Sequence, residues 1–133
     1  MLKKKGFSKR SKTFEIPTPP PDYDSLPPIF SLKYMNYGSK CCISKRRRRE
    51  RSTILKTLLK LSQLEWKRIS SLPREGSGYE VIRQDQFKFE FPAVVTDEVN
   101  ILVFRYSDGG RIAGFRINDI YHILMVGDNL YAH

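Results

Sequence analysis

The hydrophobic pattern changes its period along the chain, and this change restricts the fold to one that combines helices with a sheet. From residue 54 to residue 61, leucine and isoleucine recur at the spacing of an amphipathic helix. Beyond a Gly-Ser-Gly turn at 76–78, residues 87–91 alternate phenylalanine with charged side chains, which is typical of a half-buried strand. The sequence therefore predicts an α+β domain.

Residues 62–72 predict a second, shorter helix that folds back against the first. Ser62 and Glu65 have the spacing of a capping box, in which each residue satisfies a free backbone N–H of the other. Trp66 and Ile69 lie on the apolar side, and Pro73 ends the helix. We expect two antiparallel helices, with Trp66 as a core anchor rather than a ligand platform.

Four further segments have strand character, and two of them predict a hairpin. Asp108 and Gly109 separate residues 100–106 from 111–117, and Asp-Gly is a strong signal for a tight turn. Residues 120–126 predict another strand, and residues 29–34 predict one ahead of the helices. The expected fold is a helix hairpin packed on one face of a mainly antiparallel sheet of four to five strands. The expected contact between helices and sheet consists of Leu58, Leu61, Trp66, Ile69, Phe89, Phe104, Ile112, Phe115 and Leu124.

The net charge of +10 lies entirely in the first two fifths of the 133 residues. Residues 1–52 hold fourteen Lys and Arg against four acids, and residues 53–133 hold ten of each. Such an asymmetry indicates a polyanionic partner, and nucleic acid is the first candidate.

Residues 1–28 form a basic, proline-rich leader ahead of a single small domain at 29–133. Six prolines between Pro17 and Pro28 predict an extended chain, which either lies on the domain as a strap or becomes ordered only on a partner. The leader cations expected to bind nucleic acid are Lys3, Lys4, Lys5, Lys9, Arg10 and Lys12.

The densest basic cluster leads into the first helix. Cations near a helix N-terminus oppose the helix macrodipole, so local stability does not explain them. Contact with phosphate, whose oxygens match the arginine fork, is the favoured interpretation, and a merely solvated charged face is the alternative. The residues concerned are Lys45, Arg46, Arg47, Arg48, Arg49 and Arg51.

Several classes of protein are not expected. Cys41 and Cys42 are adjacent, which is a poor geometry for a disulfide, and two histidines give no zinc-ligand spacing. The chain shows no sequence signature of a cofactor enzyme, no apolar stretch of membrane-spanning length and no apolar stretch behind the basic N-terminus. We expect a cytoplasmic protein without metal or cofactor.

A second basic and aromatic constellation lies on the last strands: Arg105, Tyr106, Arg111, Arg116, Tyr121, His122, Tyr131 and His133. Arginines that stabilise a pentavalent phosphate, together with His or Tyr as proton carriers, are able to cleave RNA through its own 2'-hydroxyl. Alternation along a strand separates Arg111 from Arg116 unless Gly114 supplies a bulge. The alternative is that these are exposed strand positions paired with acids across the sheet.

Residues 29–133 resemble the RelE/ParE-like toxins of bacterial toxin-antitoxin modules. The resemblance lies in the strand sequences around Arg105, at 110–116 and at 120–126, and in the terminal Tyr131 and His133. The resemblance implies a β-α-α-β-β-β order and a metal-independent endoribonuclease that cleaves ribosome-associated mRNA. It implies phosphate roles for Arg105, Arg111 and Arg116, acid/base roles for Tyr131 and His133, and a small antitoxin protein as partner.

Three functions remain open at this point: such a toxin, a non-catalytic nucleic-acid-binding protein with a basic arm, and a protein-interaction module docked through the proline-rich strap. The first two share the basic leader, so composition does not separate them. Convergence of Arg105, Arg116, Tyr131 and His133 in one concavity favours the toxin, and their scatter over both faces of the sheet favours the binding protein.

Overall fold

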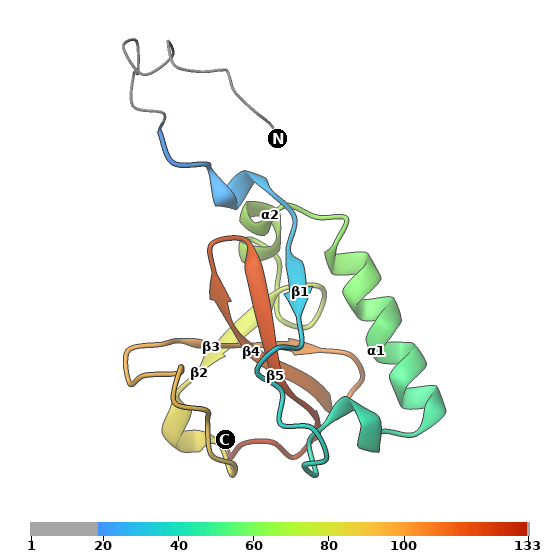
Figure 1. Ribbon diagram of the computed structural model, residues 1–133. Coiled ribbons are helices and arrows are strands. Elements are labelled where there is room, and N and C mark those ends of the chain that lie inside the picture. The colour runs from blue at the N-terminus through green and yellow to red at the C-terminus, as the bar shows by residue number, and fades with distance from the viewer. Residues whose placement is uncertain (1–18, 133) are drawn as a thin grey trace, which may run out of the picture.

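A computed structural model describes residues 19–132 and contains a five-stranded sheet with the strand order β1-β5-β4-β3-β2 (Figure 1). The strands are β1 (Ile29–Ser31), β2 (Tyr79–Ile82), β3 (Ile101–Arg105), β4 (Gly110–Ile117) and β5 (Ile120–Asp128). The helices are α1 (Arg48–Leu61) and α2 (Trp66–Ser70), with the 3-10 turns η2 (Tyr23–Ser25), η3 (Ile43–Lys45) and η4 (Gln84–Gln86).

The sheet is antiparallel except at one edge. Strands β2, β3, β4 and β5 pair antiparallel in succession, and β1 pairs parallel with β5. The predicted hairpin around Asp108 and Gly109 connects β3 with β4, and the strand predicted ahead of the helices begins at Ile29 as expected. The predicted α+β class with a mainly antiparallel sheet is therefore confirmed.

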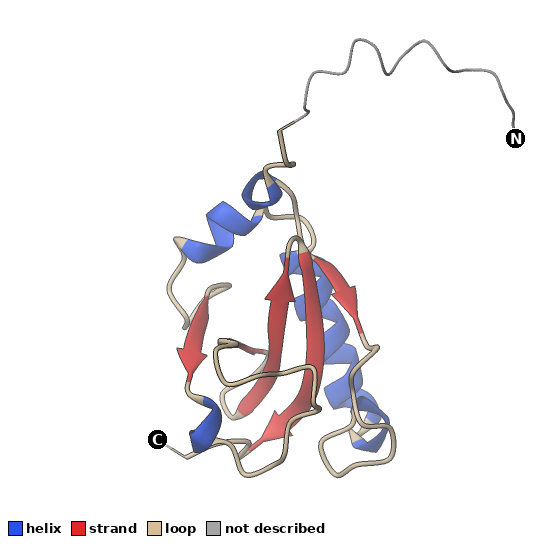
Figure 2. Cartoon of the chain, turned by 60° about the vertical axis from the view of Figure 1, so that its left-hand side comes forward, coloured by secondary structure: helices blue, strands red, loops and turns tan. Residues whose placement is uncertain are grey.

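Helix α1 lies along one face of the sheet, whereas loops cross the other face (Figure 2). Ile54 and Leu61 are buried beneath α1, and Leu58 packs against them. Leu55 and Leu59 are 62% and 65% exposed, because in a helix with 3.6 residues per turn they lie about 90° and 130° around the axis from the buried side. The buried face of α1 is therefore narrower than the run of leucines predicts.

Two apolar clusters, one on each face of the sheet, replace the single contact expected from the sequence. On the helix side, Trp66, Phe104 and Ile112 pack with the buried residues of α1. The other cluster contains Phe115 and Leu124 with Phe89 against them. The expected core was wrong for these last three residues. Phe115 and Leu124 point to the opposite face of their strands from Ile112 and Ile123, and Phe89 lies in a loop on that same face.

The predicted capping box does not form. The backbone N–H of Ser62 donates to the carbonyl oxygen of Leu58, and its hydroxyl donates to that of Leu59 at 2.7 Å. Ser62 therefore closes α1, and α2 begins only after Glu65, which makes no side-chain cap. Since α2 has five residues and packs against η2, the expected helix hairpin consists of one full helix and one short turn.

Residues 87–91 were wrongly predicted as a strand. Their phenylalanines are half-buried and Lys88 and Glu90 are exposed, as the alternation requires, but only Phe87 forms a bridge, to Tyr131. The segment is a loop laid over the second apolar cluster. The place beside β3 is taken instead by β2, which the sequence analysis did not identify.

The last part of the leader lies on the domain as a strap. The carbonyl oxygen of Leu26 accepts a hydrogen bond from the backbone N–H of Trp66 at 3.0 Å, and Asp24 forms an ion pair with Arg116. Asp24 and Leu26 thus join the end of the leader to the domain, and the 3-10 turn η2 stands where the sequence predicts an extended chain. Residues 1–18, including Lys3 to Lys12, lie outside the described residues. Cys41 and Cys42 are buried free thiols.

Candidate nucleic-acid interface

The start of α1 carries the arginine cluster, as the sequence predicts. Arg47 is the N-cap residue in an extended conformation, and Arg48, Arg49 and Arg51 occupy the first turns. All four are exposed. An arginine N-cap has no side-chain acceptor for the free N–H groups of the first turn, and no side-chain cap hydrogen bond is formed. This end of the helix is therefore electropositive from both its side chains and its backbone.

A single acid lies within the cluster, and it is held by internal partners. The Tyr106 hydroxyl donates to the Glu50 Oε2 atom at 2.5 Å, and the Arg46 guanidinium lies 3.7 Å from the same oxygen. Burial first, and the Glu50 carboxylate next, raise the pKa of Tyr106 well above its usual value, so Tyr106 stays a hydrogen-bond donor. These contacts fasten the first turn of α1 to the β3–β4 hairpin.

Arg46 differs from the arginines that follow it, because it has a structural role. Its side chain is 16% exposed, and its Nη2 atom donates to the carbonyl oxygen of Lys40 at 2.6 Å. The Arg46 guanidinium packs close to Gly127 of β5, where a Cβ would lie 2.9 Å from it and where φ is +141°. Within residues 19–132, by contrast, the side chains of Arg47, Arg48 and Arg49 make no hydrogen bond or ion pair.

Two adjoining clefts run between α1 and the β3–β4 hairpin. One, of about 410 Å³, is lined by Arg46, Arg47, Arg49, Glu50, Thr53, Tyr106, Ser107 and Asp128. The other, of about 310 Å³, shares Tyr106 and Ser107 with the first and extends to Lys60. Arg49 and Lys60 are eleven residues apart in the sequence, which corresponds to about 16 Å along the helix. The clefts thus form a groove with cations from α1 at both ends.

The constellation expected to be catalytic is only partly brought together. Arg105 and Arg111 face each other as register partners on β3 and β4. The Arg111 Nη1 atom donates to the carbonyl oxygens of Ser107 and Asp108 at 3.1 and 2.9 Å, so this side chain holds the hairpin turn. The Arg105 Nε atom is buried without a hydrogen-bond partner among residues 19–132.

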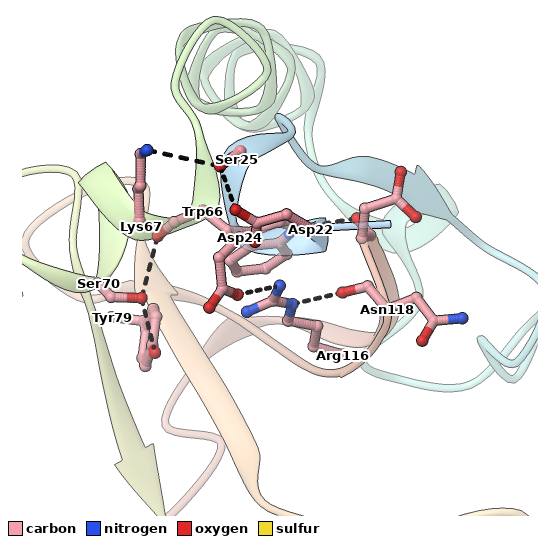
Figure 3. A network of polar contacts seen from close by, with 10 residues as sticks. Asp22, Asp24, Ser25, Trp66, Lys67, Ser70, Tyr79, Arg116 and Asn118 are labelled. Atoms are coloured by element: carbon pink, nitrogen blue, oxygen red, sulfur yellow. Dashed lines mark hydrogen bonds and ion pairs between the residues drawn. The ribbon is translucent and has the colours of Figure 1, made fainter. Parts of the chain in front are cut away.

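Arg116 lies on the opposite, helix-covered face (Figure 3). Its guanidinium carbon is 4.3 Å from the centre of the Trp66 ring, its Nη2 atom is 2.7 Å from the Asp24 carboxylate, and its Nε atom donates to the Asn118 carbonyl oxygen. Arg116 is thus the clamp that holds the strap on Trp66. This differs from the expected cross-strand pairing of an exposed strand arginine, because the Arg116 side chain is largely buried and Asp24 lies in η2 and not on a strand.

The bulge considered at Gly114 does not bring Arg111 and Arg116 to one face. A register shift does occur between Ala113 and Gly114, whose partners on β5 are Met125 and Ile123. The unpaired residue between those partners is Leu124, so the additional residue belongs to β5 and the alternation of β4 continues. Gly114 instead allows a close approach, because a Cβ there would lie 2.2 Å from a carbonyl oxygen of β5.

The remaining members of the constellation are core residues or lie outside the described chain. Tyr131 is 6% exposed, with its ring 5.2 Å from that of Phe87, and Tyr121 is fully buried. His122 stacks on Phe115 at 5.0 Å, and burial, with Lys33 second, lowers its pKa. His133 lies outside the described residues. Arg105, Arg116 and Tyr131 therefore do not share one concavity.

Sequence reasoning missed two contributors to the α1 groove. Glu50 was counted only as an acid among arginines, although its position four residues after Arg46 is the spacing of a helical ion pair. Asp128, which lines the same cleft, lies at the far end of β5 and is brought there by strand pairing. No local signal marks the second of these.

Comparison of the chain with protein-family models, with curated proteins and with solved structures found no match. Among residues 19–132, no helix combines the length and the apolar character needed to cross a membrane. The same residues contain no group of three or more His, Cys, Asp or Glu side chains placed to hold a metal ion.

Proposed function

We propose that this protein binds nucleic acid without cleaving it, through the phosphate backbone and the arginines at the start of α1. One observation carries the proposal: Arg47, Arg48 and Arg49 are exposed, consecutive and without an internal partner among residues 19–132, on a turn that is fastened to the sheet. Cytoplasmic localisation, with RNA or DNA as the partner, belongs to the same proposal.

The physical argument concerns the cost of holding these charges together. Three adjacent guanidinium groups repel one another and oppose the dipole of α1, and both penalties disappear when phosphate groups bind there. Guanidinium forks match phosphate oxygens, and the uncapped N–H groups of the first turn point toward the same anion. Such contacts are insensitive to base sequence, so the proposed binding is non-specific.

The test is the affinity of the full-length chain for a fluorescent oligonucleotide, measured by anisotropy. The variant Arg47→Gln/Arg48→Gln/Arg49→Gln is expected to bind about tenfold more weakly or worse. Its matched control is Lys67→Gln/Arg68→Gln/Arg83→Gln, which removes the same charge from exposed positions elsewhere. The control is expected to retain most of the affinity. Equal losses in the two variants would reduce the proposal to an effect of net charge.

A second candidate function, the endoribonuclease toxin, is favoured by one observation. Arg105 and Arg111 are opposite each other in register, so two cations meet beside the β3–β4 turn. In this proposal Tyr131 and His133 carry the proton transfers. Tyr131→Phe with His133→Ala is then expected to abolish growth arrest on induction and to restore full-length mRNA. Intact RNA and normal growth with the wild-type chain would leave the binding function as the better account.

A further inference from the structure

Tyr37 is the most exposed large hydrophobic residue of the described chain, at 85% exposure. Tyrosine is usually at least half buried, and an aromatic ring in water loses the burial energy that its size offers. Within residues 19–132, Tyr37 makes no hydrogen bond and no ring contact. The fold therefore gives this ring no role in packing.

The loop that carries Tyr37 is braced rather than loose. Successive turns close at Ser39, whose N–H donates to Asn36, and at Cys42, whose N–H donates to Ser39, both at 3.1 Å. The Cys41 carbonyl oxygen accepts a hydrogen bond from Val126 of β5 at 2.9 Å. The ring is thus presented from a segment fixed on the sheet, which lowers the entropic cost of using it for binding.

The same loop is joined to the arginine cluster. It leads through η3 into α1 (Figure 1), and the Lys40 carbonyl oxygen accepts the hydrogen bond of Arg46. Residues 33–51 contain eight Lys and Arg and one acid, Glu50, whose carboxylate is engaged by Tyr106 and Arg46. Tyr37 therefore belongs to a strongly cationic stretch of the chain, and the hydrogen bond of Arg46 to Lys40 ties its loop to the start of α1.

We infer that Tyr37 is a stacking platform for an unpaired base of single-stranded nucleic acid, while Arg47, Arg48 and Arg49 hold the adjacent phosphates. A cationic surface with an exposed aromatic ring is the combination that binds single strands, because every base offers a π-face to the ring. Bases of a duplex are already stacked, so this contact favours single strands over duplexes. The inference rests on the proposed function and names the form of nucleic acid it takes.

The test uses the full-length chain with three fluorescent probes: a single-stranded oligonucleotide, the duplex of the same sequence, and a single strand of abasic sites. Tyr37→Ala is expected to weaken binding of the ordinary single strand about 5- to 150-fold and to leave the other two nearly unchanged. Tyr37→Phe, which keeps the π-face, is expected to restore wild-type affinity. Leu59→Ala, at an exposed position on α1, is the control and should change none of the three.

The outcomes separate this inference from the proposed function. If neutralising Arg47, Arg48 and Arg49 removes binding while Tyr37→Ala leaves the single strand unaffected, the stacking role is wrong and the phosphate interface stands. If Tyr37→Ala weakens all three probes equally, the loop contributes shape rather than base stacking, and the inference is also overturned. If the arginine changes have no effect, the proposed function itself fails.

Discussion

Replacement of Trp66 by alanine tests whether the strap, α2 and the sheet share one anchor. Trp66 is fully buried, its indole N–H donates to the carbonyl oxygen of Asp119 at 3.0 Å, and its ring lies 4.3 Å from the Arg116 guanidinium. Truncation of a buried aromatic side chain costs about 3–5 kcal/mol. The orphaned carbonyl adds about 1 kcal/mol, and the lost cation–π contact about 0.5–1 kcal/mol.

Because these contributions are not fully additive, the expected loss is about 4–6 kcal/mol, which approaches the total stability of many domains. The assay is urea unfolding of the wild type, Trp66→Ala and Trp66→Phe, followed by circular dichroism. Trp66→Phe keeps a ring in the core but lacks the N–H, so it is expected to lose only about 1–2 kcal/mol. A loss below about 1.5 kcal/mol for Trp66→Ala would contradict its place as the shared anchor.

Three further outcomes are expected. Gly114→Ala should lower the free energy of unfolding in urea by about 3 kcal/mol or more, because its Cβ would lie 2.2 Å from a β5 carbonyl oxygen. The control Gly109→Ala, whose Cβ would have its nearest neighbour at 3.9 Å, should change that free energy by less than about 0.5 kcal/mol. Similar losses in the two variants would refute the close approach at Gly114. Because burial lowers the pKa of folded His122 below its unfolded value near 6.5, the unfolded state binds more protons, and stability should fall as pH drops from 7 to 5. His122→Asn should remove most of that fall in the urea midpoint, and an unchanged fall would assign it to other groups. Asp128→Asn should tighten oligonucleotide binding about two- to threefold by anisotropy, since the carboxylate lines the arginine-bearing cleft; weaker binding would count against the cleft as the interface.

The parts of the fold that sequence patterns predicted are the ones decided by local interactions. The Asp108–Gly109 turn and the apolar runs on either side of it define β3 and β4, and the apolar spacing from Ile54 onward defines α1. These signals need no knowledge of the rest of the chain. The α+β class follows from them.

Most of the missed features depend on distant partners, whereas the capping box fails for a local reason. The backbone of Ser62 continues α1, so its hydroxyl goes to Leu59 and not to a new helix. Strand β2 is a four-residue edge strand whose place is set by pairing with β3. The core has two sides because α1 covers one face of the sheet and loops cover the other (Figure 2), and Phe115 and Leu124 face the loops.

In the candidate site, too, the locally determined features were predicted and the long-range ones were missed. The arginine cluster was predicted on α1 because charge and helix period are both local. The contacts of Arg116 were not predicted, because its partner Asp24 is 92 residues away in the sequence. Residue type alone did not distinguish a clamp arginine such as Arg116 from an arginine without an internal partner, such as Arg48, among residues 19–132.

The most direct test of the arginine interface is the salt dependence of oligonucleotide binding. For the full-length chain, the logarithm of the association constant should fall linearly with the logarithm of the salt concentration. Because each phosphate contact contributes about 0.7–0.9 to the slope, Arg47→Gln/Arg48→Gln/Arg49→Gln should make it shallower by about 2–3. Parallel lines for this variant and the wild type would show that these arginines do not contact phosphate, and would contradict the central claim.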